Sequence, residues 1–195
     1  MPYGPIMAEK FVPENEKEGS SLSPEEDGFI DLVEVREEDA AQFPRELIVE
    51  REGEYTAEQR KNLFQMILGM SVPQRIRLAM LGNREARKML AHDRNQMIPK
   101  AVLRSPKLTD NEILAFAQER STPEDIILAI CKNRVWMKKY PIRLALVSNP
   151  KTPFSVAVQF LDHLHDKDLQ ALSRDKNIPS ALAQIAWQVF AKRKR

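Results

Sequence analysis

The sequence predicts an all-α chain, in which a short right-handed solenoid of stacked helical hairpins follows an acidic, largely disordered amino-terminal tail. Three observations support this prediction. No glycine follows Gly82 in a chain of 195 residues, although tight β-turns depend on glycine for positive φ angles. Apolar residues recur at helical spacing from Thr56 onward. Four segments share a proline signal that is typical of helix beginnings.

The charges divide the chain near residue 55. Residues 1–55 carry 16 acidic and 5 basic side chains, a net charge of −11, whereas residues 56–195 carry 12 acidic and 25 basic side chains, a net charge of +13. Pro, Gly, Ser and Glu dominate residues 1–28, and such a segment buries too little apolar surface to offset the entropy of ordering it. We therefore expect a mostly disordered tail over 1–55 and a basic helical-repeat domain over 56–195.

Two short apolar segments interrupt the tail, over residues 29–35 and 43–49. The first is either a docking motif that becomes ordered on a partner or a short edge element that packs on the chain's own body. The sequence leaves both interpretations open. The apolar residues of this motif are Phe29, Ile30, Leu32, Val33 and Val35.

The body contains repeated helix-start signals. Capping boxes at 56–59 and 109–112 predict that two helices begin there. Four more helices are expected to carry a proline in the first turn, where its missing N–H costs nothing. These prolines are Pro73, Pro123, Pro153 and Pro179. Apolar residues stand three and seven positions after each proline, so each helix presents one inner stripe. The residues expected to be buried at matching places are Ile126, Ile130, Val156 and Leu182.

Longer segments repeat as well. Residues 101–107 resemble residues 145–151, and residues 119–123 resemble residues 175–179, in the same order along the chain. Short helices separated by Asn, Ser and Pro indicate helical hairpins that build a common core by stacking.

The pattern Asn-Pro-x-Thr-Pro-x-x-Val at residues 149–156 resembles bacterial leucine-rich-repeat-variant and HEAT-like α-helical repeats. The stretch from Met70 to Arg195 is also similar to an uncharacterised bacterial family. This resemblance implies a binding scaffold rather than a particular chemistry. Some leucine-rich-repeat-variant proteins are associated with an iron–sulfur cluster held by clustered cysteines. This chain has only Cys131, so no such cofactor is expected.

Two groups of residues are candidates for binding a partner. In the first, cations and aromatic residues are interleaved at helical spacing: Arg134, Trp136, Lys138, Lys139 and Tyr140. This pattern suits an acidic peptide with an aromatic anchor, or phosphates with base stacking. The alternative is that the two aromatic residues pack between hairpins and the lysines are merely solvated. The second group forms a basic face at i, i+3, i+4 spacing: Arg84, Arg87 and Lys88.

We expect a non-enzymatic scaffold or adaptor that binds a protein partner, or an acidic segment of one, on this basic surface. The alternative is a nucleic-acid-binding repeat protein that contacts phosphates through the same cations. In either case the chain's own acidic tail is expected to compete for the surface, because it has the opposite charge.

Several classes of protein and site are not expected. The sequence has no phosphate-binding glycine loop, no Gly-x-Ser-x-Gly elbow and no His-Glu-x-x-His motif. His163 and His165 stand two positions apart and would point to different sides of a helix, which argues against a shared metal. There is no basic region followed by an apolar stretch at the amino end, and the longest apolar run, 126–131, is too short to span a bilayer. A cytoplasmic location without membrane insertion is therefore expected.

Overall fold

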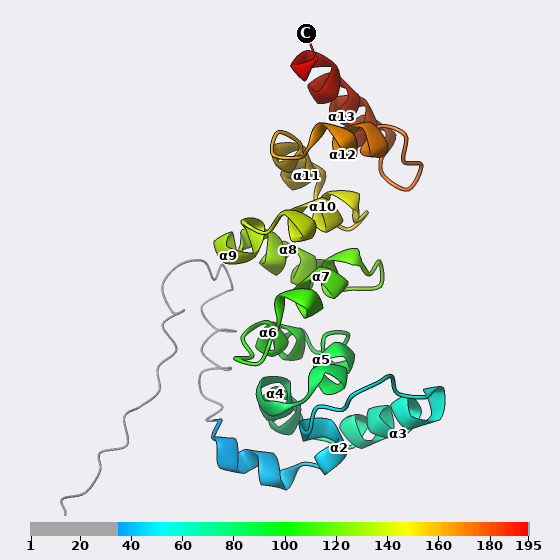
Figure 1. Cartoon of the computed structure of the whole chain (residues 1–195). Coiled ribbons are helices and arrows are strands. Elements are labelled where there is room, and N and C mark those ends of the chain that lie inside the picture. Colours follow the sequence, from blue (N-terminus) through cyan, green and yellow to red (C-terminus); the bar gives the residue numbers. More distant parts are fainter. Residues whose placement is uncertain (1–34, 195) are drawn as a thin grey trace, which may run out of the picture.

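The computed structural model describes residues 35–194, and every regular element in this range is helical (Figure 1). The all-α prediction is thereby confirmed. The predicted disorder of residues 1–34, together with four residues of the apolar motif (Phe29, Ile30, Leu32 and Val33), lies outside the described residues.

A 3-10 helix precedes twelve α-helices within the described range. The elements are η1 (Glu37–Gln42), α2 (Arg45–Ile48), α3 (Ala57–Leu68), α4 (Val72–Leu81), α5 (Arg84–Leu90), α6 (Met97–Leu103), α7 (Asp110–Gln118), α8 (Glu124–Lys132), α9 (Arg134–Met137), α10 (Tyr140–Ser148), α11 (Phe154–Leu161), α12 (Asp166–Leu172) and α13 (Ser180–Arg193).

The helices succeed one another along one long axis, from η1, α2 and α3 at one end to α13 at the other (Figure 1). Helices that are not consecutive lie side by side, since α4 packs on α6 and α7 packs on α10. In Figure 1, α4, α6 and α9 lie on one side of the stack and α5, α7 and α10 on the other. The regular right-handed solenoid remains a prediction.

The predicted helix starts agree with the local geometry. Thr56 Oγ1 accepts a hydrogen bond from the backbone N–H of Gln59 at 3.2 Å, and the Thr109–Glu112 box has the same arrangement. Pro73 lies in the first turn of α4. The other three prolines stand one position earlier than predicted, as the N-cap residues of α8, α11 and α13, with φ near −55°. The fixed φ of proline suits the extended residue before a helix as well as the first turn.

The core consists of two clusters of buried side chains. One extends from Phe43 to Leu146 and the other from Val147 to Phe190, so α10 contributes to both. Three of the four repeat positions are buried as predicted, namely Ile126, Ile130 and Leu182. The prediction for Val156 is wrong, because Val156 is only half-buried. Ala157 and Leu161 form the buried stripe of α11 instead, so the inner face of this helix is displaced by one residue.

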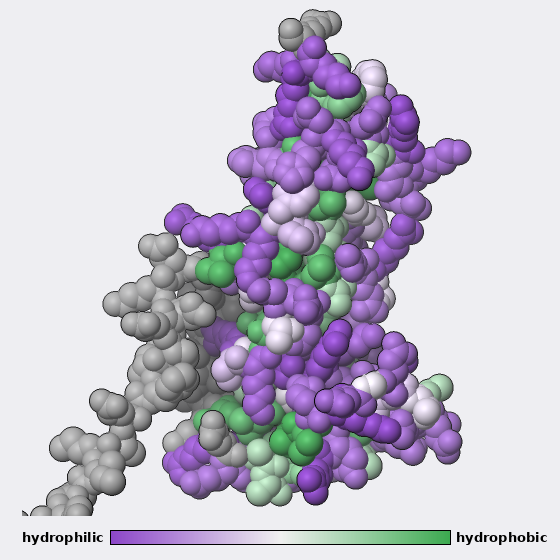
Figure 2. Space-filling view, in the orientation of Figure 1, coloured by the Kyte–Doolittle hydropathy of each residue, from purple (hydrophilic) through white to green (hydrophobic). Residues whose placement is uncertain are grey.

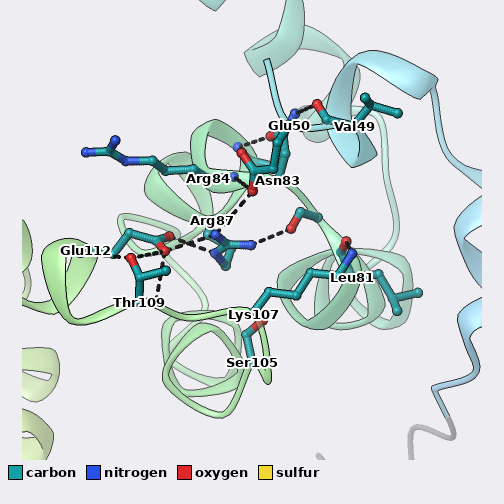
Figure 3. Close-up of polar contacts among 12 residues, drawn as sticks. Val49, Glu50, Leu81, Asn83, Arg84, Arg87, Ser105, Lys107, Thr109 and Glu112 are labelled. Atoms are coloured by element: carbon teal, nitrogen blue, oxygen red, sulfur yellow. Dashed lines mark hydrogen bonds and ion pairs between the residues drawn. The ribbon is translucent and has the colours of Figure 1, made fainter. Parts of the chain in front are cut away.

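The two similar segments 101–107 and 145–151 make equivalent contacts. In the first, Ser105 Oγ donates to the carbonyl of Met80 and Lys107 Nζ to that of Leu81, at the end of α4 (Figure 3). In the second, Asn149 Nδ2 donates to the carbonyl of Ala117, while the Nζ of Lys151 donates to those of Ser121 and Thr122. Both segments therefore satisfy backbone carbonyls at or just beyond the end of an earlier helix.

The folded body begins before the predicted boundary at 55/56. Leu47 on α2 is fully buried, and Phe43 belongs to the first core cluster. Asn83 Nδ2 donates to the carbonyls of Glu46 and Val49 at 2.7 and 2.9 Å. Even Val35, the first described residue, is partly buried against this cluster. The described part of the predicted tail is thus folded onto the body, because its apolar residues complete the core at this end of the stack.

Candidate functional site

The predicted basic face of α5 is divided between the surface and the interior. Arg87 is only 2% exposed. Its Nε and Nη2 donate to the two carboxylate oxygens of Glu112 at 2.7 and 3.0 Å, and its Nη1 donates to the carbonyl of Gly82 (Figure 3). Arg84 points away from this cluster in Figure 3 and, like Lys88, is exposed. The prediction that Arg87 is a surface residue for a partner is therefore wrong.

Two features of the sequence place Arg87 inside. It stands on the inner stripe of α5, three positions before the buried Leu90 and next to the buried Ala86. Glu112, its partner, is the capping-box residue of α7, and Glu112 Oε2 accepts from the N–H and hydroxyl of Thr109 at 3.0 and 2.8 Å. Both carboxylate oxygens of Glu112 thus accept hydrogen bonds, and the pair is a structural joint between α5 and α7.

The aromatic residues of the other candidate group pack into the core. Trp136 is partly buried against the first cluster and Tyr140 against the second. Tyr140 stacks on His165 with ring centroids 4.0 Å apart, accepts from the backbone N–H of His165 and donates its hydroxyl to Asp168. Burial, and then the bond to Asp168, raises the pKa of Tyr140. These contacts support the interpretation in which both aromatic rings are structural.

The structure does not bring the two predicted groups together. Helix α5 carries Arg84 and Lys88, whereas α9 lies on the opposite side of the stack (Figure 1). Within the second group, Lys139 forms an ion pair with Asp110, while Lys138 is exposed at the end of α9. The single basic surface expected from the sequence is therefore two separate groups of cations.

A different set of cations shares one side of the stack. Helices α4, α6 and α9, as the structure bounds them, contain no acidic residue. They are linked through neighbours, since α4 packs on α6, α6 on α8 and α8 on α9. We call this the basic side and define it by five residues on these helices or at their carboxyl ends: Arg77, Lys100, Arg104, Arg134 and Lys138.

Apolar side chains lie on the same helices as these cations. Val135 on α9 is 55% exposed, and Met97 and Leu103 on α6 are half-buried. Hydrophilic residues dominate the view in Figure 2, with hydrophobic atoms gathered at the level of α8 to α10 and at the end formed by η1 and α2. The basic side therefore offers positive charge together with some apolar contact area.

A shallow groove lies on the other side of the stack, between α7 and α10. It has a volume of about 360 Å³. Its lining combines apolar residues with four polar or charged ones, Gln118, Arg120, Ser148 and Asp175. With one cation and one carboxylate, this groove has no marked preference for an anionic or a cationic ligand.

One cluster contains a serine and a histidine in contact, which the sequence did not suggest. His92 Nε2 lies 3.4 Å from Ser121 Oγ, and His92 Nδ1 lies 3.0 Å from the carbonyl of Lys88. The serine hydroxyl, however, donates its proton to Glu119 Oε1 at 2.7 Å rather than to the imidazole. A nucleophilic serine requires its base to accept that proton. The cluster is therefore a link between the end of α5 and the loop after α7.

The remaining candidate positions make local contacts. His163 faces the carbonyl of Gln159 within its own helical turn, apart from His165. Among residues 35–194, no three His, Cys, Asp or Glu side chains gather in an arrangement that could hold a metal ion. In the same range, no helix combines the length and apolar character needed to cross a bilayer.

Comparison of the chain with protein-family models, with curated proteins and with solved structures finds no match. The resemblance to leucine-rich-repeat-variant and HEAT-like repeats accordingly rests on the motif at residues 149–156.

Proposed function

We propose that this protein is a non-enzymatic cytoplasmic scaffold that binds an acidic segment of a protein partner on its basic side. The observation that carries the proposal is the absence of acidic residues from the neighbouring helices α4, α6 and α9. A negatively charged ligand meets no like charge on these three helices. Because exposed ion pairs are individually worth about 0–1 kcal/mol, binding requires several cations together.

The apolar residues of the basic side favour a protein ligand over a nucleic acid. Val135 and Leu103 can contact aliphatic side chains that stand between acidic ones. Sequence-tolerant binding of single-stranded nucleic acid relies on exposed aromatic rings that stack with bases. The aromatic residues that would do so, Trp136 and Tyr140, instead pack against the core clusters. The nucleic-acid alternative uses the same cations, but Trp136 and Tyr140 do not serve as its stacking rings.

The test compares two double charge reversals that alter the net charge equally. Lys100→Glu with Arg104→Glu changes the basic side, and Arg84→Glu with Lys88→Glu changes exposed residues on the opposite side. Fluorescence anisotropy measures binding of a labelled peptide of alternating Glu and Leu, and of a single-stranded DNA of equal charge. We expect the first double variant to bind the peptide at least tenfold more weakly and the control to change affinity less than about threefold.

Two results would overturn the proposal. Equal losses in both double variants would mean that only the overall charge matters. Tighter binding of the DNA than of the peptide, with loss confined to Lys100→Glu/Arg104→Glu, would assign the basic side to nucleic acid.

A further inference from the structure

We propose that the chain's own amino-terminal segment, residues 1–34, occupies the basic side in cis and that a partner must displace it. This inference rests on the proposed function, because it concerns the same surface. It identifies one ligand of that surface and a means of regulating access to it.

Charge complementarity is the first argument. Residues 1–34 contain nine acidic and two basic side chains, a net charge of −7. Helices α4, α6 and α9 carry only basic charges. In residues 29–34, Asp31 and Glu34 alternate with the apolar motif. This is the combination of negative charge and apolar contact that the basic side accommodates.

The position where the described chain begins is the second argument. Val35 is partly buried against the first core cluster, and the following element, η1, packs on α4. The segment therefore joins the body beside the first helix of the basic side. An extended chain spans up to about 3.4 Å per residue, so residues 29–33 can reach about 20 Å from Val35. With helix axes about 8–10 Å apart, this reach covers α4 and α6.

The rest of the segment is long enough to reach α9. Two further helix spacings beyond α6 amount to about 20 Å, which about six extended residues can span. The acidic residues at 25–27 lie 8–10 positions before Val35, so in an extended segment they fall between α6 and α9. A tether of this length holds a ligand at an effective concentration in the millimolar range. Weak contacts are then sufficient for partial occupancy, and a competing partner binds with a correspondingly lower apparent affinity.

The experiment uses the full chain and two sets of three neutral substitutions. One set, Asp27→Asn, Asp31→Asn and Glu34→Gln, removes charge from the segment. The matched control, Glu52→Gln, Glu54→Gln and Glu58→Gln, removes equal charge from exposed positions of the body. We expect the first set to bind the Glu/Leu peptide about five- to tenfold more tightly than the unmodified chain at 50 mM salt. The control set should change the affinity less than about twofold. The difference should vanish near 1 M salt, where the Debye length falls to about 3 Å.

A second measurement reports on the segment without any added ligand. A nitroxide on Ser20→Cys, in a Cys131→Ser background, should broaden the amide NMR signals of α4, α6 and α9 but not those of α5 and α10. A mixed sample tests whether docking occurs within one chain. It contains nitroxide-bearing chains without ¹⁵N and ¹⁵N-labelled chains without the nitroxide, and the same broadening must be absent from it.

The outcomes separate the two proposals. Uniform broadening, or equal peptide binding by the two sets of variants, would overturn docking in cis while leaving peptide binding by the basic side intact. Failure of every variant to bind the peptide, including the variant with a neutralised segment, would instead overturn the proposed function.

Discussion

Arg87 and Glu112 form a buried, bidentate ion pair that joins α5 to α7 across 25 positions of sequence. Both side chains are almost completely removed from solvent, at 2% and 5% exposed. The remaining polar atoms of the pair are used as well, by the carbonyl of Gly82, the carboxylate of Glu50 and the donors of Thr109. A charge pair of this kind is stable only as a complete unit, because each partner alone would be an uncompensated buried charge.

Replacing Arg87 with Met should therefore destabilise the protein by about 3–5 kcal/mol, since Glu112 then remains buried without its cation. Urea unfolding followed by circular dichroism measures this. The control is Arg84→Met, an exposed arginine on the same helix, which should change the stability by no more than about 0.5 kcal/mol. Equal midpoints for the two variants would show that the pair is not a structural joint.

Removing residues 1–55 should be far more damaging than removing residues 1–34. The longer deletion takes away Leu47 and Phe43 and leaves Asn83 without the carbonyls of Glu46 and Val49. Loss of one buried leucine side chain alone costs about 2–5 kcal/mol. The shorter deletion keeps every described residue of both core clusters and should shift the unfolding free energy by less than about 1 kcal/mol. Similar melting curves for the two deletions would instead support the domain boundary at 55/56 that the sequence predicts.

Asn149→Ala should cost about 1–3 kcal/mol, the usual penalty for leaving a buried polar group unpaired. Asn149 is 5% exposed. Its Nδ2 donates to the carbonyls of Ala117 and Glu119, and its Oδ1 accepts from the backbone N–H of Lys151. Asn111→Ala, at an exposed position on α7, is the matched control and should be neutral or slightly stabilising. Coinciding thermal melts of the two variants would show that the hydrogen bonds of Asn149 do not stabilise the fold.

Cys131 should react slowly with thiol reagents while the protein is folded. Burial raises the pKa of its thiol from 9.0 to about 11, and the reactive species is the thiolate. At pH 8 the thiolate fraction is then about one hundredth of that of an ordinary thiol, so labelling should be at least about a hundredfold slower than in unfolded protein. Because the folded thiol holds its proton more tightly, stability should decline as the pH rises from about 9 to 11. Equal labelling rates in the folded and urea-unfolded protein would contradict this prediction.

The helices and most of their inner faces follow from local sequence. Capping boxes, prolines with fixed φ and apolar residues at i, i+4 act within one or two helical turns, so they predict where helices begin and which stripe is buried. The similarity of 101–107 to 145–151 indicated repetition, and the structure shows that the two segments make equivalent contacts. Val156 was misplaced although α11 begins directly after its N-cap proline, as α8 and α13 do. Its buried stripe, Ala157 and Leu161, lies one residue later than in those helices, so packing against neighbouring helices and not the helix start decides which face is buried.

The candidate surface depended on relationships between distant residues. Arg84, Arg87 and Lys88 look alike in sequence, and only Glu112, brought close by the packing of α7 near α5, separates the buried arginine from the exposed cations. Trp136 and Tyr140 were ambiguous for the same reason, since a ring that packs in a core and a ring that binds a partner have the same spacing.

The sequence and the tertiary structure each determined a different aspect of the charge distribution. Composition showed that an acidic amino-terminal part precedes a basic body, because net charge does not depend on conformation. Which cations share a face could not be read from the chain, since alternate helices lie on opposite sides of the stack (Figure 1). The packing of α4 on α6, and of α8 on both α6 and α9, gathers residues from 77 to 138 on one side. Long-range packing decides such groupings because each contact joins positions far apart in sequence, where no local pattern links them.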